Sequence, residues 1–426
     1  MEFRNLTPLH AMAFNAVDIP GNEFHVVVLK AGYELIGRTP DPQNPITHEC
    51  VLLEGDDALP LVMADEYEGE VGLSSVREES DLAPFKPACD VIVRATAHAP
   101  GGTPAASWEA GLWLWDRSRC MIEKSIGISG PRVWASGLFG WSLSRATPIV
   151  TLPVRWEYAF GGRSYVESKR DSGDVLINEA CFSNPIGCGW IERRFPALAT
   201  HKESRSSTDV LQSVEQRDGV GFVRAAQIES MDKPQNELVV ARHPEEEADA
   251  FHMSTIASNY GVSPVGLGVV GRAWAPRLAL AGTYDDEWLR ARWPYLPQNF
   301  DFRYWNSAPA DQQIPWPQSD FAFELINLAH PSCTLSGHLI ARLPGHRAVT
   351  ALRLANGAIF PVQMPLDTIV IDAEQMRVSL TWRAIFPLTP EVRVCEARFE
   401  TDPTAPLLRY ADNSFTHPER KQWQTT

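Results

Sequence analysis

The sequence predicts a mainly β fold with some α-helix, an α+β chain, and three observations lead to this prediction. Several short segments are rich in β-branched and aromatic residues, the types that are enriched in strands. Other segments alternate apolar and polar residues with a period of two, as half-buried strands do. Helix signals stand out at only two places, both in the middle of the chain.

Residues 1–165 are predicted to form a β-rich N-terminal domain of antiparallel sheets, similar to a β-sandwich. Segments 24–36 and 89–97 are rich in β-branched residues and predict two strands. Period-two spacing puts apolar residues on one face of a strand. Segments 108–115 and 150–160 show this spacing, through Trp108, Ala110, Leu112 and Leu114 in the first and Trp156, Tyr158 and Phe160 in the second.

Residues 166–310 are expected to form a mixed region of loops and helices. Pro244-Glu245-Glu246-Glu247 is a typical helix start, because proline fits the first helical position and carboxylates favour the first turn. Residues 285–293 have helical spacing that ends at Pro294.

The last part of the chain is predicted to be β-rich again and to pack on the rest. Residues 311–410 carry strand signals at 320–328, 349–354, 367–371 and 376–386. Residues 411–426 are polar and are expected to form a flexible tail.

Composition narrows the classes of function. With 426 residues, 44% hydrophobic and 21% charged, the chain is typical of a globular protein of more than one domain. A net charge of −15 disfavours nucleic-acid binding, because it repels phosphates. The seven cysteines are scattered and form no Cys-x-x-Cys pair, which favours a reducing compartment. No signal peptide and no membrane span is evident, so we expect a cytoplasmic location without membrane insertion.

Motifs that carry catalytic chemistry are mostly missing. The segment Gly266-x-Gly268-x-x-Gly271 matches the bare dinucleotide-binding pattern, but Pro276 interrupts the helix that should follow. The sequence has no phosphate-binding loop, no nucleophile elbow and no histidine spacing typical of a metal site. We therefore predict no enzyme activity, no cofactor and no metal. A hydrolase on a β scaffold is the alternative, with His98, Asp90 and Asp285 as its first candidate residues.

Two loops share one pattern, (Asn/Ser)-Pro-(Ile/Val)-Gly-x-Gly, at 184–189 and 263–268. Proline restricts one φ and glycine permits positive φ, so both segments predict tight, preset loops. They are either two independent turns or paired loops that frame one surface. Segment 300–317 mixes aromatic residues, arginine and proline, a composition that suits core packing and also binding hot spots.

An ordered series of short motifs runs from about residue 5 to residue 386. It includes Phe24-His-Val-Val-Val-Leu-Lys-Ala31, Lys86-Pro-Ala-Cys-Asp90, His98-Ala-Pro-Gly-Gly102, Trp156-Glu-Tyr-Ala-Phe-Gly-Gly162, Asn184-Pro-Ile-Gly-Cys-Gly189, Trp293-Pro-Tyr-Leu-Pro297, Asp301-Phe-Arg-Tyr-Trp-Asn306 and Val378-Ser-Leu-Thr-Trp-Arg383. As a set they resemble a bacterial family of type VI secretion effector adaptors or chaperones, which carries a numbered designation as a domain of unknown function.

This resemblance implies a cytoplasmic protein that binds a toxic effector and helps to load it onto the VgrG–PAAR spike. Its partners would be a PAAR-containing or spike-associated toxin and VgrG itself. The resemblance implies no catalytic residues. A structural component of the spike is a further alternative.

The site hypothesis places the docking surface on loops 98–102, 184–189, 264–268 and 301–313, clustered on one face. Its residues would be His98, Asn184, Gly187, Gly189, Pro264, Gly266, Arg303, Tyr304, Trp305 and Gln312. Glycines allow close backbone approach, and Arg303, Tyr304 and Trp305 would serve as anchors. The alternative is that these loops are structural corners of the fold.

Overall fold

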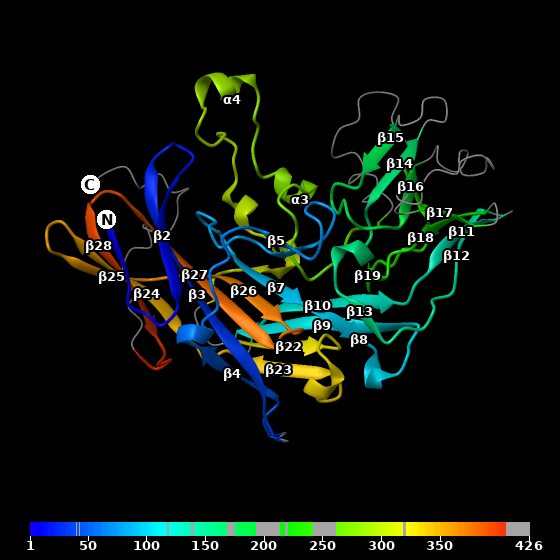
Figure 1. Cartoon of the computed structure of the whole chain (residues 1–426), viewed down its shortest axis with the longest axis horizontal. Coiled ribbons are helices and arrows are strands. Elements are labelled where there is room, and N and C mark those ends of the chain that lie inside the picture. The colour runs from blue at the N-terminus through cyan, green and yellow to red at the C-terminus, as the bar shows by residue number, and fades with distance from the viewer. Residues whose placement is uncertain are drawn as a thin grey trace.

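One large, curled β-sheet dominates the computed structural model of the chain (Figure 1). The structure describes residues 1–405 apart from 40, 42, 117–118, 138–139, 168–174, 193–213, 218–219, 242–260 and 318–320. Within these residues the sheet has 12 strands. In spatial order they are β19 (Ile228–Ser230), β10 (Arg119–Ser129), β9 (Ser107–Asp116), β22 (Phe321–Ile326), β23 (His338–Arg342), β4 (His48–Leu53), β3 (Glu23–Gly37), β27 (Arg377–Pro387), β26 (Leu366–Asp372), β7 (Cys89–Arg94) and β21 (Gln313–Ile314), with β2 (His10–Val17) paired to β3.

The centre of the sheet is covered on both faces. In β3 every residue from Phe24 to Tyr33 is buried, His25 and Lys30 included, which explains why apolar and polar residues do not alternate along this strand. The neighbouring strand β27 pairs antiparallel with β3 over the whole length of β27. By contrast β22 alternates buried and half-buried residues, with Phe321, Phe323 and Leu325 buried, as a strand with one covered face does.

The sheet joins distant parts of the chain. The pair β3 and β27 brings the segment near residue 30 beside the segment near residue 380. Strand β9 pairs with β22, and β7 runs parallel to β26. The apolar cluster packed around the sheet contains residues from Leu9 to Ala397, and smaller clusters lie beside it. The sheet therefore crosses both of the predicted boundaries, at 165 and at 310, and the first 165 residues form no separate sandwich in the described structure.

Smaller sheets surround the large one. They comprise a four-stranded sheet of β1 (Glu2–Asn5), β28 (Val392–Glu400), β24 (Arg347–Leu354) and β25 (Ile359–Gln363), a second of β12 (Gly140–Leu143), β11 (Val133–Gly137), β18 (Val220–Arg224) and β17 (Val214–Arg217), and the pairs β13 (Thr151–Pro153) with β8 (Thr96–His98), β14 (Arg163–Glu167) with β15 (Val175–Ala180), β16 (Trp190–Glu192) with β20 (Val239–Ala241), and β5 (Glu66–Tyr67) with β6 (Val76–Glu78).

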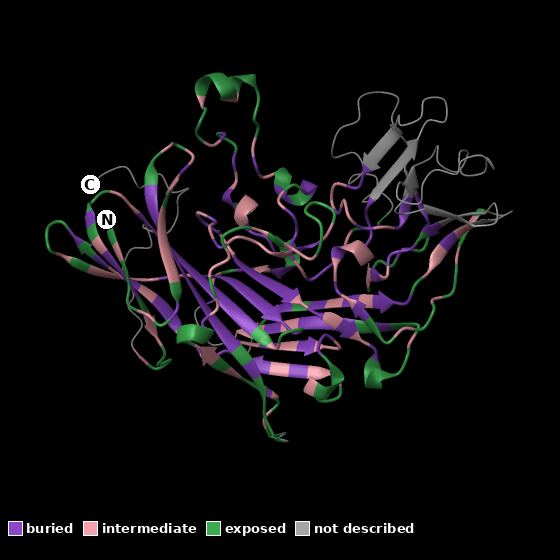
Figure 2. Ribbon diagram, in the orientation of Figure 1, coloured by how far each residue is buried: buried purple, intermediate pink, exposed green. Residues whose placement is uncertain are grey.

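The α-helices of the described residues are short. They are α3 (Ala275–Leu278) and α4 (Asp286–Ala291), and several 3₁₀ turns accompany them. They form no layer of their own, so the described fold is mainly β, and the α+β expectation is not supported. Helix α4 stands away from the sheet, and its surface is almost entirely exposed (Figures 1 and 2).

Most strands predicted from periodicity are present. Segment 24–36 corresponds to β3, 108–115 to β9, 320–328 to β22 and 376–386 to β27. The prediction of a strand over 150–160 was wrong: β13 ends at Pro153, and residues 156–158 form a 3₁₀ turn. Proline lacks the N–H that a continuing ladder needs, and the turn buries Trp156 and Phe160 without a strand.

The two predicted helices differ in outcome. The helix at 285–293 is confirmed as α4, whose Asp285 side chain caps the first turn. The helix start at 244–247 and the tail 411–426 lie outside the described residues. In the described part of the chain, no helix is long and apolar enough to cross a membrane.

Candidate protein-binding surface

A short excursion of the chain between residues 283 and 299, here called the α4 arm, stands out from the body (Figure 1). Its two ends are tied together by paired hydrogen bonds. The N–H of Thr283 donates to Asn299 Oδ1 at 3.0 Å, and Asn299 Nδ2 donates to Thr283 Oγ1 at 2.9 Å. Just below, the N–H of Asp301 donates to the carbonyl of Leu280 at 2.9 Å. The α4 arm is therefore a closed loop on a fixed base.

Local chemistry explains why helix α4 forms at this place. Asp285 Oδ1 accepts the N–H of Trp288 at 2.8 Å and caps the helix, while Asp286 and Glu287 oppose the helix dipole in the first turn. The ring of Trp288 packs edge-on against Tyr284, with centroids 4.8 Å apart. Its Nε1 donates to the carbonyl of Tyr295 at 2.9 Å. The arm thus carries its own small aromatic scaffold.

The arm exposes large apolar side chains that this scaffold does not bury. Their exposed fractions are 54% for Tyr284, 58% for Leu289, 65% for Trp293 and 45% for Tyr295. Figure 2 shows α4 in the colour of exposed residues, against a buried sheet. Full burial of such a side chain stabilises by about 1.5–3 kcal/mol. The α4 arm is therefore a surface on which contact with another molecule is favourable.

The arm is also held in orientation by the turn between β2 and β3. Arg292 Nη2 donates to the carbonyls of Ile19 and of Leu296, the latter at 2.8 Å. The ring of Tyr295 lies over Gly21, where a Cβ would stand 3.1 Å from it. Contacts at the base and on this side keep the exposed residues in place, which lowers the entropy cost of binding.

Below the arm, residues 300–305 form an aromatic shelf, in which Phe300 and Phe302 are buried and Tyr304 and Trp305 are half-buried. Phe300 packs edge-on against Phe302 and Tyr304, and Tyr304 packs against Trp305 at 5.4 Å. Two arginines lie over the outer rings, Arg277 at 5.6 Å from Tyr304 and Arg272 at 5.4 Å from Trp305. Cation–π contacts of this kind add to the packing.

The three residues of this shelf that were predicted as anchors differ in how far they are exposed. Tyr304 and Trp305 are half-buried, so their rings serve packing as well as surface. The side chain of Arg303 is 63% exposed and its Nε lies 2.8 Å from Asp301 Oδ2. The hydrogen bond from Arg303 lowers the pKa of Asp301.

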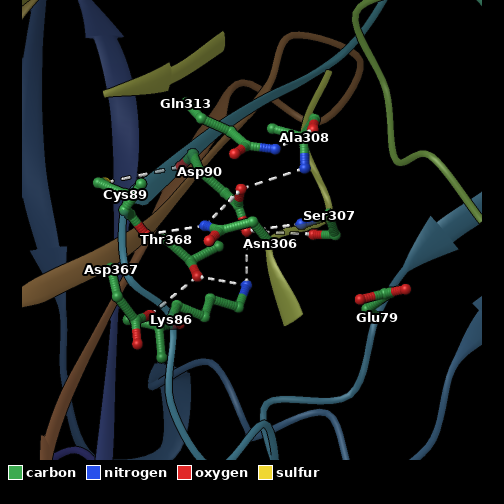
Figure 3. A network of polar contacts seen from close by, with 12 residues as sticks. Glu79, Lys86, Cys89, Asp90, Asn306, Ser307, Ala308, Gln313, Asp367 and Thr368 are labelled. Atoms are coloured by element: carbon green, nitrogen blue, oxygen red, sulfur yellow. Dashed lines mark hydrogen bonds and ion pairs between the residues drawn. The ribbon is translucent and has the colours of Figure 1, made fainter. Parts of the chain in front are cut away.

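A buried polar network fixes the shelf to the sheet (Figure 3). Its centre is Asp90, which is 0% exposed. The Asp90 carboxylate accepts from Lys86 Nζ at 2.8 Å, from Asn306 Nδ2 at 3.0 Å and from the N–H of Ser307 at 2.9 Å. The N–H of Ala308 donates to Asp90 Oδ1, the oxygen that also accepts from Asn306, at 3.2 Å. Both oxygens of Asp90 are occupied by groups that position residues 306–308 beside β7.

Gln312, another predicted site residue, is fully buried and connects other segments of the chain through hydrogen bonds. Its Nε2 donates to the carbonyls of Val91 at 2.7 Å and Leu267 at 3.0 Å. Its Oε1 accepts from Lys124 Nζ at 2.8 Å. Gln312 therefore joins the loop 301–313 to the loop 264–268.

The two loops of similar sequence meet at one residue. Asn184 Nδ2 donates to the carbonyls of Trp156 and Phe160, each at 2.9 Å, and Asn184 is fully buried. On the other loop, a Cβ on Gly266 would stand 3.0 Å from the ring of Trp156. Trp156 also packs edge-on against Trp274 at 5.5 Å. The loops 184–189 and 264–268 are therefore neighbours, as the interpretation of paired loops requires.

The remaining predicted residues have structural contacts. A Cβ on Gly187 would stand 2.4 Å from the carbonyl oxygen of Ala159, and one on Gly189 would stand 3.1 Å from Gln235 Oε1. Pro264 is half-buried. His98 lies in β8, where it pairs with Thr151 and its ring packs against His330 at 5.4 Å. Burial and the nearby His330 lower the pKa of His98. The contacts thus join three of the four predicted loops. His98, in the fourth loop, contacts other parts of the chain.

Sequence reasoning assigned no binding role to the exposed residues of the α4 arm. The sequence signal that could have indicated an exposed surface is the mixture of large apolar and charged residues between Gly282 and Pro297, which includes Tyr284, Leu289, Trp293 and Tyr295. Asp285, a candidate of the hydrolase alternative, is the helix cap of this arm. Among the described residues, no group of three His, Cys, Asp or Glu side chains is placed to hold a metal ion.

Comparison with known proteins gives one result. No match was found among curated proteins, and none among solved structures. A family model described as "Uncharacterized protein conserved in bacteria (DUF2169)" matches residues 21–383, which include β3, most of β27, the shelf and the α4 arm. The chain therefore belongs to this bacterial family.

Proposed function

We propose that this protein is an adaptor that binds a type VI secretion effector in the cytoplasm and helps to load it onto the VgrG–PAAR spike. The observation that carries the binding role is the α4 arm, with four large apolar side chains held in exposed positions. The secretion context is supported by the ordered motifs that resemble effector adaptors. The proposal is for a binding protein without cofactor, metal or catalytic step.

The chemistry of the arm favours one kind of occupant. Asp285, Asp286 and Glu287 are exposed at the start of the arm's helix and outnumber its exposed Arg290, and the whole chain carries a net charge of −15. Charge complementarity therefore favours a polypeptide segment with apolar side chains flanked by lysine or arginine. An effector held in this way would keep its apolar segment out of water before export.

Trp293 is the strongest anchor of this surface. Tryptophan and tyrosine dominate binding hot spots because they bury a large area at low entropy cost. Trp293 is the most exposed of the four apolar residues, and Leu289 follows it. Loss of both side chains would remove most of the apolar contact without disturbing the core.

The test is co-purification of the toxin encoded by the neighbouring gene with the double variant Trp293→Ala/Leu289→Ala. The matched control is Leu335→Ala/Ile359→Ala, which removes two exposed apolar side chains from other elements. We expect the arm variant to bind the toxin at least about 10-fold more weakly. The melting temperature of the arm variant should not change, and neither should toxin binding by the control variant. Equal binding by both variants would rule out the arm as the docking surface.

Localisation separates the adaptor from a spike component. An adaptor remains in the cell while the toxin appears in the medium. Recovery of this protein from the medium together with VgrG would favour the spike component instead. Toxin that is soluble and secreted normally in a strain without this protein would contradict the proposed function.

A further inference from the structure

A small cavity lies beside the loop 264–268, away from the exposed tip of the α4 arm. It has a volume of about 30 Å³, and its wall includes Arg77, Arg94, Arg155, Trp156, Glu68 and Glu374. Strands β6 and β7 supply Arg77 and Arg94. Three arginines thus line one cavity in a protein whose net charge is −15.

Two buried hydrogen-bond donors of residues that line this cavity lack an acceptor. Within the described structure, the buried Nε1 of Trp156 and the buried Nε of Arg94 have no hydrogen-bond partner. Trp156 itself is only 5% exposed. Arg77 forms no ion pair with any described residue, while Arg94 and Arg155 each bind one carboxylate, Asp372 and Glu68, at 2.9 Å. A buried donor without an acceptor costs stability, so such groups mark a place for a ligand or water.

The acidic groups around the cavity are already engaged. Glu68 accepts from Arg155, and Glu374 accepts from Thr96 Oγ1 at 2.8 Å. Asp372 accepts from Arg94 and from the N–H groups of Glu374 and Gln375, at 3.1 and 3.0 Å. The local shortage is therefore of acceptors, although the surrounding charges are close to balance.

The size of the cavity limits what can enter. A water-sized group needs about 10–15 Å³ by the same measure, so about 30 Å³ holds two such groups. The two oxygens of a carboxylate fit this space. Gly268 lies in the wall, where a Cβ would stand 3.9 Å from Trp156 Nε1, so a side chain there would narrow the space. Glu374, also in the wall, is exposed, which places the opening at the surface.

We propose that this cavity binds one carboxylate, presented by an acidic side chain or the C-terminus of the partner polypeptide. The macromolecular source rests on the proposed adaptor function, whereas carboxylate binding itself does not. A single carboxylate is compatible with the acidic surface, because the remainder of the partner can be basic or apolar. Trp156 Nε1 and Arg94 Nε supply buried donors, and Arg77 supplies a guanidinium group that forms no ion pair with a described residue.

The first experiment uses acetate as the probe and reads the ¹H–¹⁵N signals of the tryptophan indoles. Trp156→Phe assigns the signal of Trp156. We expect acetate, but not chloride at equal ionic strength, to shift this signal with saturation. Arg77→Gln should weaken acetate binding about 5- to 10-fold, and the exposed control Arg393→Gln should not. An unmoved Trp156 signal, or equal binding by Arg77→Gln and the wild type, overturns the carboxylate site and leaves ordered water as its occupant.

The second experiment distinguishes the source of the carboxylate. The toxin of the neighbouring gene is titrated into wild type, Arg77→Gln and Arg393→Gln. Weaker binding by Arg77→Gln alone supports a carboxylate of the partner. Toxin binding that Arg77→Gln leaves unchanged, together with a positive acetate result, overturns the partner as source and assigns the site to free small carboxylates. If the toxin fails to bind the wild type, the adaptor function fails, while the acetate experiment still decides the site.

Discussion

The ammonium group of Lys86 lies 2.8 Å from the carboxylate of Asp90, and the two side chains are 6% and 0% exposed. Lys86 also donates to Thr368 Oγ1 on β26, at 2.9 Å. Asp90 in turn holds residues 306–308 through their side-chain and backbone N–H groups. One buried ion pair therefore links β7, β26 and the aromatic shelf (Figure 3).

Removal of one partner of this pair should be strongly destabilising. Lys86→Met leaves the Asp90 charge buried without its cation, and we expect a loss of about 3–5 kcal/mol in the free energy of unfolding. Urea denaturation measures it. Arg393→Met, at an exposed position of β28, should cost less than about 0.5 kcal/mol. The double variant Lys86→Met/Asp90→Asn should regain part of the loss, and a Lys86→Met loss below about 1 kcal/mol would contradict the linkage.

The contact between the loop 184–189 and the segment 156–162 should depend on Gly162. Its φ is +95°, and a Cβ there would stand 2.0 Å from the carbonyl oxygen of Gly187. Gly162→Ala combines backbone strain with a clash against backbone, so we expect a loss of about 4 kcal/mol or more. Gly102 is the matched control, since its φ is +67° and a Cβ would meet nothing within 4 Å.

For Gly102→Ala only the cost of the left-handed backbone remains, about 1–2 kcal/mol. Thermal unfolding of the two variants separates the cost of backbone strain from the cost of the clash. Equal losses in melting temperature would show that the clash relaxes and that the two segments are not rigidly packed.

Mild acid should destabilise the protein through four buried or half-buried histidines. Burial lowers the pKa of His25, His48, His98 and His346 from the ordinary value of 6.5. The unfolded chain then binds more protons than the native chain around and below pH 6.5, so the free energy of unfolding falls as the pH falls towards the lowered native pKa values. Urea denaturation between about pH 8 and pH 5.5 should show this fall.

His346 offers a single-residue check of the same effect. Its Nδ1 lies 3.1 Å from the hydroxyl of Tyr33, and its ring packs against Phe399 at 5.5 Å. His346→Gln should flatten the pH dependence of stability, whereas the exposed His10→Gln should leave it unchanged. A pH slope that is the same in both variants would assign the acid sensitivity to other groups.

The sequence by itself determined the local elements. Alternation in 108–115 predicted β9 and its buried face, and the β-branched and aromatic residues in 24–36 predicted β3. Asp285 and Pro294 bounded the helix α4. Period, capping and proline act within a few residues, so these features can be predicted from neighbours in the chain.

Only the tertiary structure decided which strands pair and which side chains remain outside. The pairing of Tyr33 with Val378, the meeting of Asn184 and Gly266 at Trp156, and the exposure of Trp293 depend on residues far apart in the chain. An aromatic residue has the same apolar character in a core and on an arm. Its burial is set by what the rest of the fold brings against it, and that information is non-local.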